Sequence, residues 1–392
     1  MLKKNIPFEK IAWLNIVVCG KFHYENYALN LQELGALKCL YFSHKRTSFS
    51  KIPKQNKVNH PLKEVLLHLH LYLIKEFALS HLLPIYHWIW ELELSRSFVA
   101  APVNLFLLHG NCRRAMLIAR SQGNIVVGEA VNAHPNQLQT TLLNEAKLFH
   151  LSNQDADEGG KKIIRDAKLC DYLLTPSFSV KESYVKEGFD PERIFVLPYG
   201  LNKKINSVSR VRHLKGNFNL LYVGQIFLRK GLHRYIQFLR DNQALLPIKT
   251  IDLTLVGRPN PDYLAALREQ NYPFHHISHI ANNEMIEYMK NFDALILPSI
   301  EDGFGMVVVE AMAAGIPVLV SKHAGASDLV NEIGGGYIFD PFDEKSMFNA
   351  LKNCMENGPP PVKCVDLSWA MYSQKLLQIL SKVRNEHNPI AA

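Results

Sequence analysis

A pair of acidic residues stands directly before a glycine loop in the second half of this 392-residue chain. Glu301 and Asp302 precede Gly303-Phe304-Gly305, and the following residues predict a helix at about 306–314 with Glu310 on its second turn. A glycine loop that leads into a helix N-terminus presents unpaired N–H groups and the positive end of the helix dipole, which favours an anion. The carboxylates are suited instead to accepting hydrogen bonds from sugar hydroxyls.

A nucleotide sugar carries both phosphate and hydroxyl groups and would suit both parts of this stretch. The alternative is an ordinary strand–loop–helix unit of an α/β sheet. A buried strand is predicted at 294–297, Gly315 and Pro317 end the helix, and 316–320 predicts the next buried strand. These elements would place the loop at the carboxyl end of a parallel strand.

Other glycine, histidine and cationic residues follow further predicted strands. Ligands of parallel α/β sheets bind beyond the carboxyl ends of the strands, so the position of Gly20 after 11–19 makes it a site candidate. The alternatives are a plain connecting glycine, a loop histidine and surface cations. His134 follows 124–127, Gln225, Arg229 and Lys230 follow 220–223, and Arg258 follows 251–256.

Residues 298–318 resemble the donor-site signature of the family 4 retaining glycosyltransferases, which have the GT-B fold. The family pattern is Pro-Ser-x-x-Glu-Gly-Phe-Gly, four variable positions, and then Glu-Ala-Met-Ala-x-Gly-x-Pro-Val. Glu310 matches the second glutamate, whereas Asp302 stands in place of the first and Glu301 is one position out of register. We therefore expect Asp302 to be the first acid of the donor site.

The resemblance implies a role for each matching residue. Glu310 would hold ribose hydroxyls, Asp302 and His134 would position the sugar, and the diphosphate would lie against Lys230 and the loop N–H groups. The implied donor-binding residues are Gly20, Gln225, Arg229, Lys230, Arg258, Glu301, Gly303, Phe304, Gly305, Met306 and Val307, and the implied catalytic residues are His134, Asp302 and Glu310.

By this resemblance the chain would be a retaining glycosyltransferase that needs no metal cofactor and transfers a sugar from a nucleotide diphosphate sugar to a hydroxyl acceptor. The acceptor would be a glycan, a lipid-linked molecule or a small molecule. A GT-B-like epimerase or phosphorylase would share the cleft. A catalytically dead nucleotide-sugar binder is a further alternative, because Asp302 replaces a glutamate and Gln225 replaces the arginine of the family's Gly-Arg-…-Lys-Gly segment.

The resemblance also implies a domain organisation. Two facing Rossmann-like α/β domains are expected at 1–200 and 217–368, with a linker at 201–216 and a closing helix at 369–384 that packs back on the first domain. The first would receive the acceptor and the second would bind the nucleotide sugar. Domain closure would assemble the active site between them.

The net charge of +8 lies mostly in the first half, where residues 1–200 carry 24 Lys and Arg against 18 Asp and Glu. An anionic membrane surface or a phosphorylated acceptor is the expected partner, whereas no nucleic-acid recognition module is visible. Six scattered cysteines, no convincing signal peptide and no run of about 18 uncharged apolar residues predict a cytoplasmic protein, peripheral on the inner membrane face if it meets the membrane.

Two stretches leave alternatives open. Residues 65–94 are rich in leucine, histidine and aromatic residues and predict one or two helices, which would either pack in the core or form an interfacial patch for a lipid-linked acceptor. The Asp155-Ala156-Asp157 run could hold a metal, but it precedes a predicted helix at 161–169, where acids at a helix start explain it better.

Overall fold

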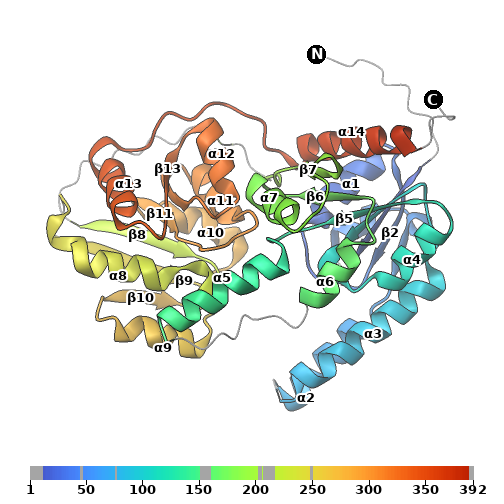
Figure 1. Ribbon diagram of the computed structural model, residues 1–392, viewed down its shortest axis with the longest axis horizontal. Helices are drawn as coiled ribbons and strands as arrows, with labels where there is room; N and C mark the ends of the chain where they lie inside the picture. The colour runs from blue at the N-terminus through green and yellow to red at the C-terminus, as the bar shows by residue number, and fades with distance from the viewer. Residues whose placement is uncertain are drawn as a thin grey trace.

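The computed structural model describes residues 12–44, 47–75, 77–150, 160–201, 205, 217–247 and 250–387. They form two parallel sheets with helices packed against them (Figure 1). The first sheet has the order β3-β2-β1-β4-β5-β6-β7, and the second has the order β10-β9-β8-β11-β12-β13. In each sheet the order reverses once, and a ligand crevice opens at the carboxyl ends of the strands beside that point. The expected fold of two Rossmann-like domains is confirmed.

The first sheet and its helices occupy the N-terminal half. Its strands are β1 Leu14–Val18, β2 Leu37–Phe42, β3 Lys57–Asn59, β4 Val103–Leu107, β5 Ile125–Glu129, β6 Tyr172–Thr175 and β7 Ile194–Val196. Its helices are α1 Tyr24–Glu33, α2 Leu62–Ile74, α3 Leu79–Ser97, α4 Arg113–Ser121, α5 Pro135–Leu148, α6 Gly160–Ala167 and α7 Phe178–Lys186.

The second sheet follows the same plan. Its strands are β8 Phe218–Val223, β9 Ile251–Val256, β10 Phe274–Ile277, β11 Ala294–Leu297, β12 Val318–Ser321 and β13 Gly336–Phe339. Its helices are α8 Leu232–Asn242, α9 Pro261–Glu269, α10 Asn282–Met289, α11 Met306–Ala314, α12 Ala326–Ile333 and α13 Glu344–Asn357, and α14 Trp369–His387 closes the chain. The bounds of α11 agree with the predicted helix, and Gly315 ends it in the left-handed conformation.

The closing helix α14 returns to the first domain, as expected, and packs against α1 (Figure 1). The ring of its first residue, Trp369, lies 6.4 Å from that of Tyr199 and edge-on to that of Tyr372 at 5.2 Å. The chain also pairs across the two halves where Leu201 N–H donates to the Leu367 carbonyl at 2.6 Å. An aromatic cluster therefore holds the end of the chain against the crossing between the domains.

The strands of the first sheet are buried because helices cover both of its faces. β1 and β4 are buried at every position, as expected for parallel strands with both faces covered. One face of the first sheet packs with α3, α4, α6 and α7. Its other face joins a core that continues through α14 into the second domain.

One local prediction is wrong, and one helix was not foreseen. The apolar residues at Leu29, Leu31, Leu34 and Leu37 predict a helix over 28–37, but α1 begins four residues earlier, at Tyr24, and ends at Glu33, because Gly35 turns the chain at a φ of +74° and β2 starts at Leu37. No helix was predicted at 135–148, where α5 begins with His134 as its N-cap and Pro135 in its first turn. In Figure 1, α5 runs from the first domain toward the second.

Helices α2 and α3 occupy the stretch for which two alternatives were open. They form a pair at the edge of the first domain farthest from α14 (Figure 1). Trp90 and Leu94 of α3 are buried, whereas most apolar residues of α2 face outward, so the core-packing interpretation is wrong for α2. Within the described ranges, no helix combines the length and apolar character needed to cross a bilayer.

Candidate active site

Three glycines bring the loops of the second sheet together at its carboxyl edge. A Cβ atom on Gly257 would lie 1.9 Å from the Gly224 carbonyl oxygen, and one on Gly231 would lie 2.0 Å from the Pro298 carbonyl oxygen. All three glycines have positive φ, which other residues adopt only with strain. The loops after β8, β9 and β11 therefore meet beside the point where the strand order reverses.

Four charged side chains form two ion pairs at this edge. Lys230 Nζ and Asp302 Oδ2 lie 2.5 Å apart, and Arg229 Nη1 lies 3.1 Å from Glu301 Oε2. Burial raises the pKa of Asp302, but the positive charges of Lys230 and Arg229 outweigh it and hold that pKa below its usual value. The sequence separated these residues by about seventy positions, and the structure brings all four together.

The glycine loop and α11 lie directly beside the ion pairs. Gly305 is the N-cap of α11, with a φ of +90°. The N–H groups of Met306 and Val307 come first in the helix and have no intrahelical acceptor. Glu310 is half-buried one turn further on, and burial raises the pKa of its carboxyl. This edge of the domain thus offers N–H donors, cations and carboxylates to one ligand.

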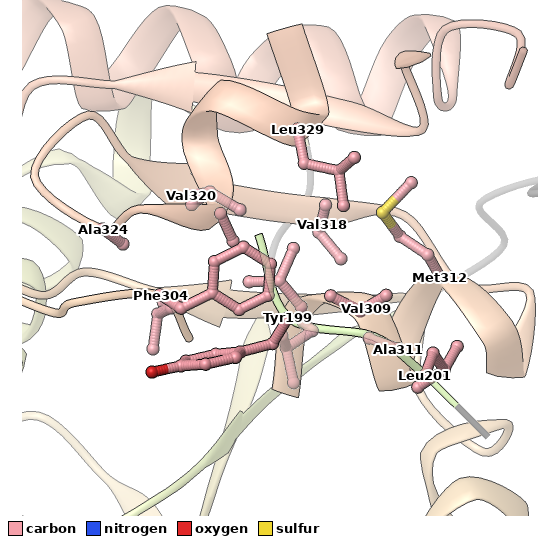
Figure 2. Close-up of a cluster of buried hydrophobic side chains, with 14 of the residues drawn as sticks. Tyr199, Leu201, Phe304, Val309, Ala311, Met312, Val318, Val320, Ala324 and Leu329 are labelled. Carbon is pink, nitrogen blue, oxygen red and sulfur yellow. The ribbon is translucent and has the colours of Figure 1, made fainter. Parts of the chain in front are cut away.

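Phe304 has a structural place in the loop. It is buried, and its ring lies 5.6 Å from that of Tyr199 at an angle of 82°. Figure 2 shows the ring of Phe304 above the edge-on ring of Tyr199, beside Val309 of α11. The side chain of Phe304 therefore anchors the glycine loop to the crossing between the domains.

The first domain touches the same loop. A Cβ atom on Gly303 would lie 1.7 Å from the Val131 carbonyl oxygen, so only glycine allows this approach. The Ser177 hydroxyl donates to the Gly303 carbonyl at 2.9 Å, and the Ala133 N–H donates to Glu301 Oε1 at 3.0 Å. The carboxylate of Glu301 thus links Arg229 to the backbone of the opposite domain.

His134 lies inside the first domain. Its side chain packs against Tyr184 and Phe189, and its Nδ1 accepts from the Asn136 N–H at 3.4 Å and lies 3.7 Å from Glu187 Oε2. Only 1% of the residue is exposed, and burial lowers the pKa of the imidazole. The position expected from the sequence is correct, after β5, but the ring faces α7.

The remaining sequence candidates occupy the edges of the two sheets. Gly20 follows β1 and donates its N–H to the Ser43 hydroxyl at 2.8 Å, within the first domain. Gln225 follows β8, and its carbonyl accepts from the Tyr222 hydroxyl at 2.6 Å. Arg258 follows β9, and its carbonyl accepts from the Ile226 N–H at 3.0 Å. Gln225 lines the same cavity as Arg229, whereas Gly20 and Arg258 stand in the loops after β1 and β9.

A cavity of about 500 Å³ lies between the two domains beside the ion pairs. Its apolar wall comes from α5, α6 and the segment after β8, and its polar groups come from both domains. The apolar residues are Leu138, Leu142, Ile163, Ile164 and Phe227, and the polar ones are His109, Asn132, Gln139, Lys161, Gln225 and Arg229. Sequence reasoning missed the contribution of α5 and α6, since their residues show no chemical motif.

A buried carboxylate lies beneath the contact between the domains. Glu129, at the end of β5, is 2% exposed and accepts a hydrogen bond from the Tyr27 hydroxyl at 3.0 Å. Burial raises the pKa of Glu129 to about 7, although the hydrogen bond from Tyr27 and the nearby hydroxyl of Tyr199 act in the opposite direction. The only sequence signal was an acid at the end of an apolar strand.

A second missed contact joins the domains through α5. Glu145 accepts from Arg234 Nε at 2.6 Å and from Arg234 Nη2 at 2.7 Å, and His233 Nε2 lies 3.0 Å from the same carboxylate. Burial raises the pKa of Glu145, but the hydrogen bonds and charges of His233 and Arg234 prevail and lower it to about 2. This bidentate pair fixes α5 of the first domain on α8 of the second.

Residues that could hold a metal are not grouped in the described part of the chain, where no three His, Cys, Asp or Glu side chains gather with suitable geometry. The Asp155-Ala156-Asp157 run lies outside the described residues. The positive charge at the site comes from Lys230, Arg229 and the N-terminus of α11.

The overall arrangement is similar to that of known GT-B glycosyltransferase structures. The structure of Anabaena Alr3699/HepE in complex with UDP aligns with a TM-score of 0.60 and 15% identity, covering 95% of this chain and 100% of that one. The apo lipopolysaccharide outer core galactosyltransferase WaaB aligns with a TM-score of 0.59 and 18% identity, covering 95% and 99%. At these identities the likeness shows the fold.

Sequence comparison matches the C-terminal half of the chain to a known family. Residues 205–367 match the family described as glycosyl transferases group 1. The O-antigen chain mannosyltransferase RfbU of Salmonella typhimurium is 31% identical over 194 residues, 47% of this chain and 51% of the relative. The lipopolysaccharide glucosyltransferase WaaG of Escherichia coli is 28% identical over 196 residues, 46% and 50%. The matches thus span about half the length of these relatives.

Proposed function

We propose that this protein transfers a sugar from a nucleotide diphosphate sugar to a hydroxyl acceptor, with retained configuration and without a metal ion. The observation that carries the proposal is the convergence of Lys230, Asp302, Glu310 and the N-terminus of α11 on one edge that faces the first domain. The match of residues 205–367 to the glycosyl transferases group 1 family supports the same chemistry.

The donor diphosphate would bind where the cations and the free helix N–H groups meet. Lys230 would exchange part of its contact with Asp302 for a phosphate oxygen, while Met306 and Val307 donate their N–H groups. These donors would stabilise the charge that grows on the leaving diphosphate. Gly20, Gln225 and Arg258 would border the nucleotide from the loops after β1, β8 and β9.

The carboxylates would orient the two sugars of the donor. Glu310 would accept from ribose hydroxyls, and Asp302 would accept from the transferred sugar. Because burial raises the pKa of Glu310, its carboxyl ionises at a higher pH than that of an exposed glutamate. The ionised carboxylate is the stronger hydrogen-bond acceptor. His134 would act by holding the start of α5, whose neighbour Ala133 contacts Glu301.

In the transfer step the bond from the sugar's anomeric carbon to the diphosphate oxygen breaks. A bond from that carbon to the acceptor oxygen forms on the same face, and the acceptor proton passes to the leaving phosphate oxygen. The acceptor would enter the cavity bounded by α5 and α6, which lies next to Arg229. The contacts of Glu301 and Gly303 with the first domain would form on closure and exclude water.

The acceptor class is a glycan, free or lipid-linked. The relatives' names refer to O-antigen and to lipopolysaccharide, which supports a glycan acceptor here. We place the reaction in the cytoplasm, at the inner membrane face when the acceptor is lipid-linked. An epimerase or phosphorylase would use the same cleft but release different products. The substitutions at Asp302 and Gln225 are the observation that favours a nucleotide-sugar binder without turnover.

The first test is thermal unfolding with UDP, GDP, ADP and their common sugars, each with and without EDTA. A ligand that binds only the folded protein adds about 2.7 kcal/mol at 100 times its dissociation constant. A shift with one nucleotide that survives EDTA, followed by transfer of its sugar, supports the proposal. Binding without any transfer, across a panel of glycan acceptors, would identify a binder, and the absence of any shift would contradict the donor site.

A further inference from the structure

The pair α2 and α3, hereafter the arm, exposes an unusual share of the apolar surface. Nineteen large apolar side chains are exposed among the described residues, and ten of them lie between Leu62 and Trp88. Tyr72 and Leu73 in the last turn of α2 and Phe77 between the helices are 85%, 65% and 77% exposed. Scattered exposed apolar residues are normal, but a concentration of this kind marks a binding surface.

The exposed residues of α2 follow the period of the helix. Leu62, Val65, Leu69, Tyr72 and Leu73 recur at intervals of three or four positions and are all exposed, so they form one stripe along the helix. A stripe of this kind ordinarily packs on the core of its own domain. Here the stripe faces away from the first sheet and has no partner in the described structure.

Hydrogen bonds join the two helices of the arm to each other and to the first domain. His70 is buried between the helices, with Nδ1 2.9 Å from the Tyr86 hydroxyl and Nε2 2.9 Å from the Phe77 carbonyl oxygen. At the other end, Trp90 of α3 is fully buried and donates to the Gly110 carbonyl at 2.9 Å. These contacts hold the apolar turn out from the domain in a fixed position.

Two features favour a lipid surface over a protein partner. Leu71 and Ile74 are exposed as well as the stripe, so exposed apolar side chains surround the end of α2. A lipid phase can cover all sides of this helix end at once. From residue 65 to residue 90 the sequence carries charge only at Lys75 and Glu76. A second copy of the chain would cover the stripe but leave the opposite side of the turn in water.

Cationic side chains border the base of the arm. Arg113, Lys162 and Arg165 surround the same recess as Trp88 and Pro84 of α3. Asp166 offsets part of this charge through its pair with Arg113 at 3.1 Å. Apolar and aromatic groups beside cations are the combination that binds the headgroup region of anionic bilayers.

We propose that the arm inserts its stripe and its turn into the surface of a phospholipid bilayer and lies in the interface without crossing it. The length of α2, 13 residues, agrees with a helix that lies along the surface. The inference stands on the exposure of the arm and does not depend on the transferase proposal. It also names the surface through which the chain would meet lipid-linked molecules.

Flotation with phospholipid vesicles tests the proposal directly. The intact chain is expected to float with phosphatidylcholine vesicles that contain phosphatidylglycerol, and to remain bound in high salt because insertion is apolar. The triple variant Tyr72→Ser/Leu73→Ser/Phe77→Ser should lose binding by on the order of 100-fold or more, since each large apolar side chain is worth about tenfold or more. The control Val99→Ser/Leu148→Ser/Leu245→Ser changes three exposed apolar residues elsewhere and should bind normally.

Tryptophan fluorescence gives a second readout. Trp88 is 51% exposed, whereas Trp13, Trp90 and Trp369 are buried, so the emission of Trp88 should shift to the blue on vesicles. Trp88→Phe should remove that shift and retain flotation. The shift in unfolding temperature that the nucleotide causes should be the same in every arm variant as in the intact chain. A loss of vesicle binding can therefore be told apart from a loss of donor binding.

Three outcomes would overturn the proposal. The intact chain does not float with these vesicles; the triple variant floats as well as the intact chain; or the intact chain is a dimer in solution and the triple variant is a monomer, with no vesicle binding by either. The last result would assign the arm to contact between copies of the chain.

Discussion

The two sheet edges that face each other across the cleft carry different kinds of residues. The edge of the second sheet carries paired charges, glycines and a helix N-terminus, which come from two short segments of the sequence, 224–231 and 301–310. The edge of the first sheet carries a buried carboxylate beneath tyrosines and an apolar cavity whose walls come from separate helices.

The difference follows from what each edge would bind. A diphosphate is the same in every nucleotide sugar, and a short loop with a helix N-terminus suffices to bind it. Acceptors differ, and their recognition depends on the shape of a pocket assembled from distant segments. If this comparison is correct, changes on the second edge should act on the donor, and changes on the first edge should act on assembly and on pH response.

The largest expected effect is on the donor side. Lys230→Ala removes the cation nearest Asp302 and should lower the turnover of sugar transfer by on the order of 10³, because charge on the leaving diphosphate loses a preorganised partner. Lys352→Ala, a surface change on α13, is the control and should leave turnover unchanged. Equal rates for the two variants would remove Lys230 from the donor site.

The next largest effect concerns the pair that joins the domains. Glu145→Gln leaves Arg234 and His233 without their carboxylate and should lower the free energy of unfolding by about 3 kcal/mol, measured with denaturant. Glu356→Gln alters an exposed pair with a 4.0 Å separation and should cost less than about 1 kcal/mol. Similar losses in both variants would show that α5 does not hold the domains together.

The third effect is a pH response from the first edge. The pKa of Glu129 is about 7 in the folded chain and near 4.5 when unfolded, so the folded state binds the proton more tightly. Its contribution to stability is present below pH 4.5 and is lost as the pH rises to 7, by about 3 kcal/mol from this shift. The free energy of unfolding, measured with urea from pH 5 to pH 8, should therefore decline less in Glu129→Gln than in the intact chain. The same pH dependence in both proteins would contradict the assignment.

The smallest effect tests the departure from the family pattern. Gln225→Arg restores a cation beside Arg229 and should tighten nucleotide diphosphate binding by up to about tenfold, roughly 1.4 kcal/mol. Isothermal titration with the nucleotide identified by thermal unfolding measures this. Weaker binding would show that the cavity at Gln225 serves the acceptor instead, which would sharpen the comparison between the two edges.

The sequence predicted the second domain more completely than the first. The strand β11, the helix α11 and the acids before the glycine loop are local features, and their period and turn residues fix them. For the first domain the order of elements was largely foreseen, but α5 was missed and the start of α1 was misplaced. His134 was assigned by its order in the chain, whereas its rotamer depends on the packing of Tyr184 and Phe189.

The α/β architecture, the resemblance to the family 4 glycosyltransferases and the residues of the glycine loop could be predicted from the sequence, because hydrophobic period, glycine positions and a long motif are local features of the chain. Only the tertiary structure decided the pairing of Lys230 with Asp302, the place of Glu145 between the domains and the outward face of α2. A stripe of apolar residues on a helix has the same sequence pattern whether it faces a protein core or a membrane. Which of these it meets depends on where the rest of the fold places the helix.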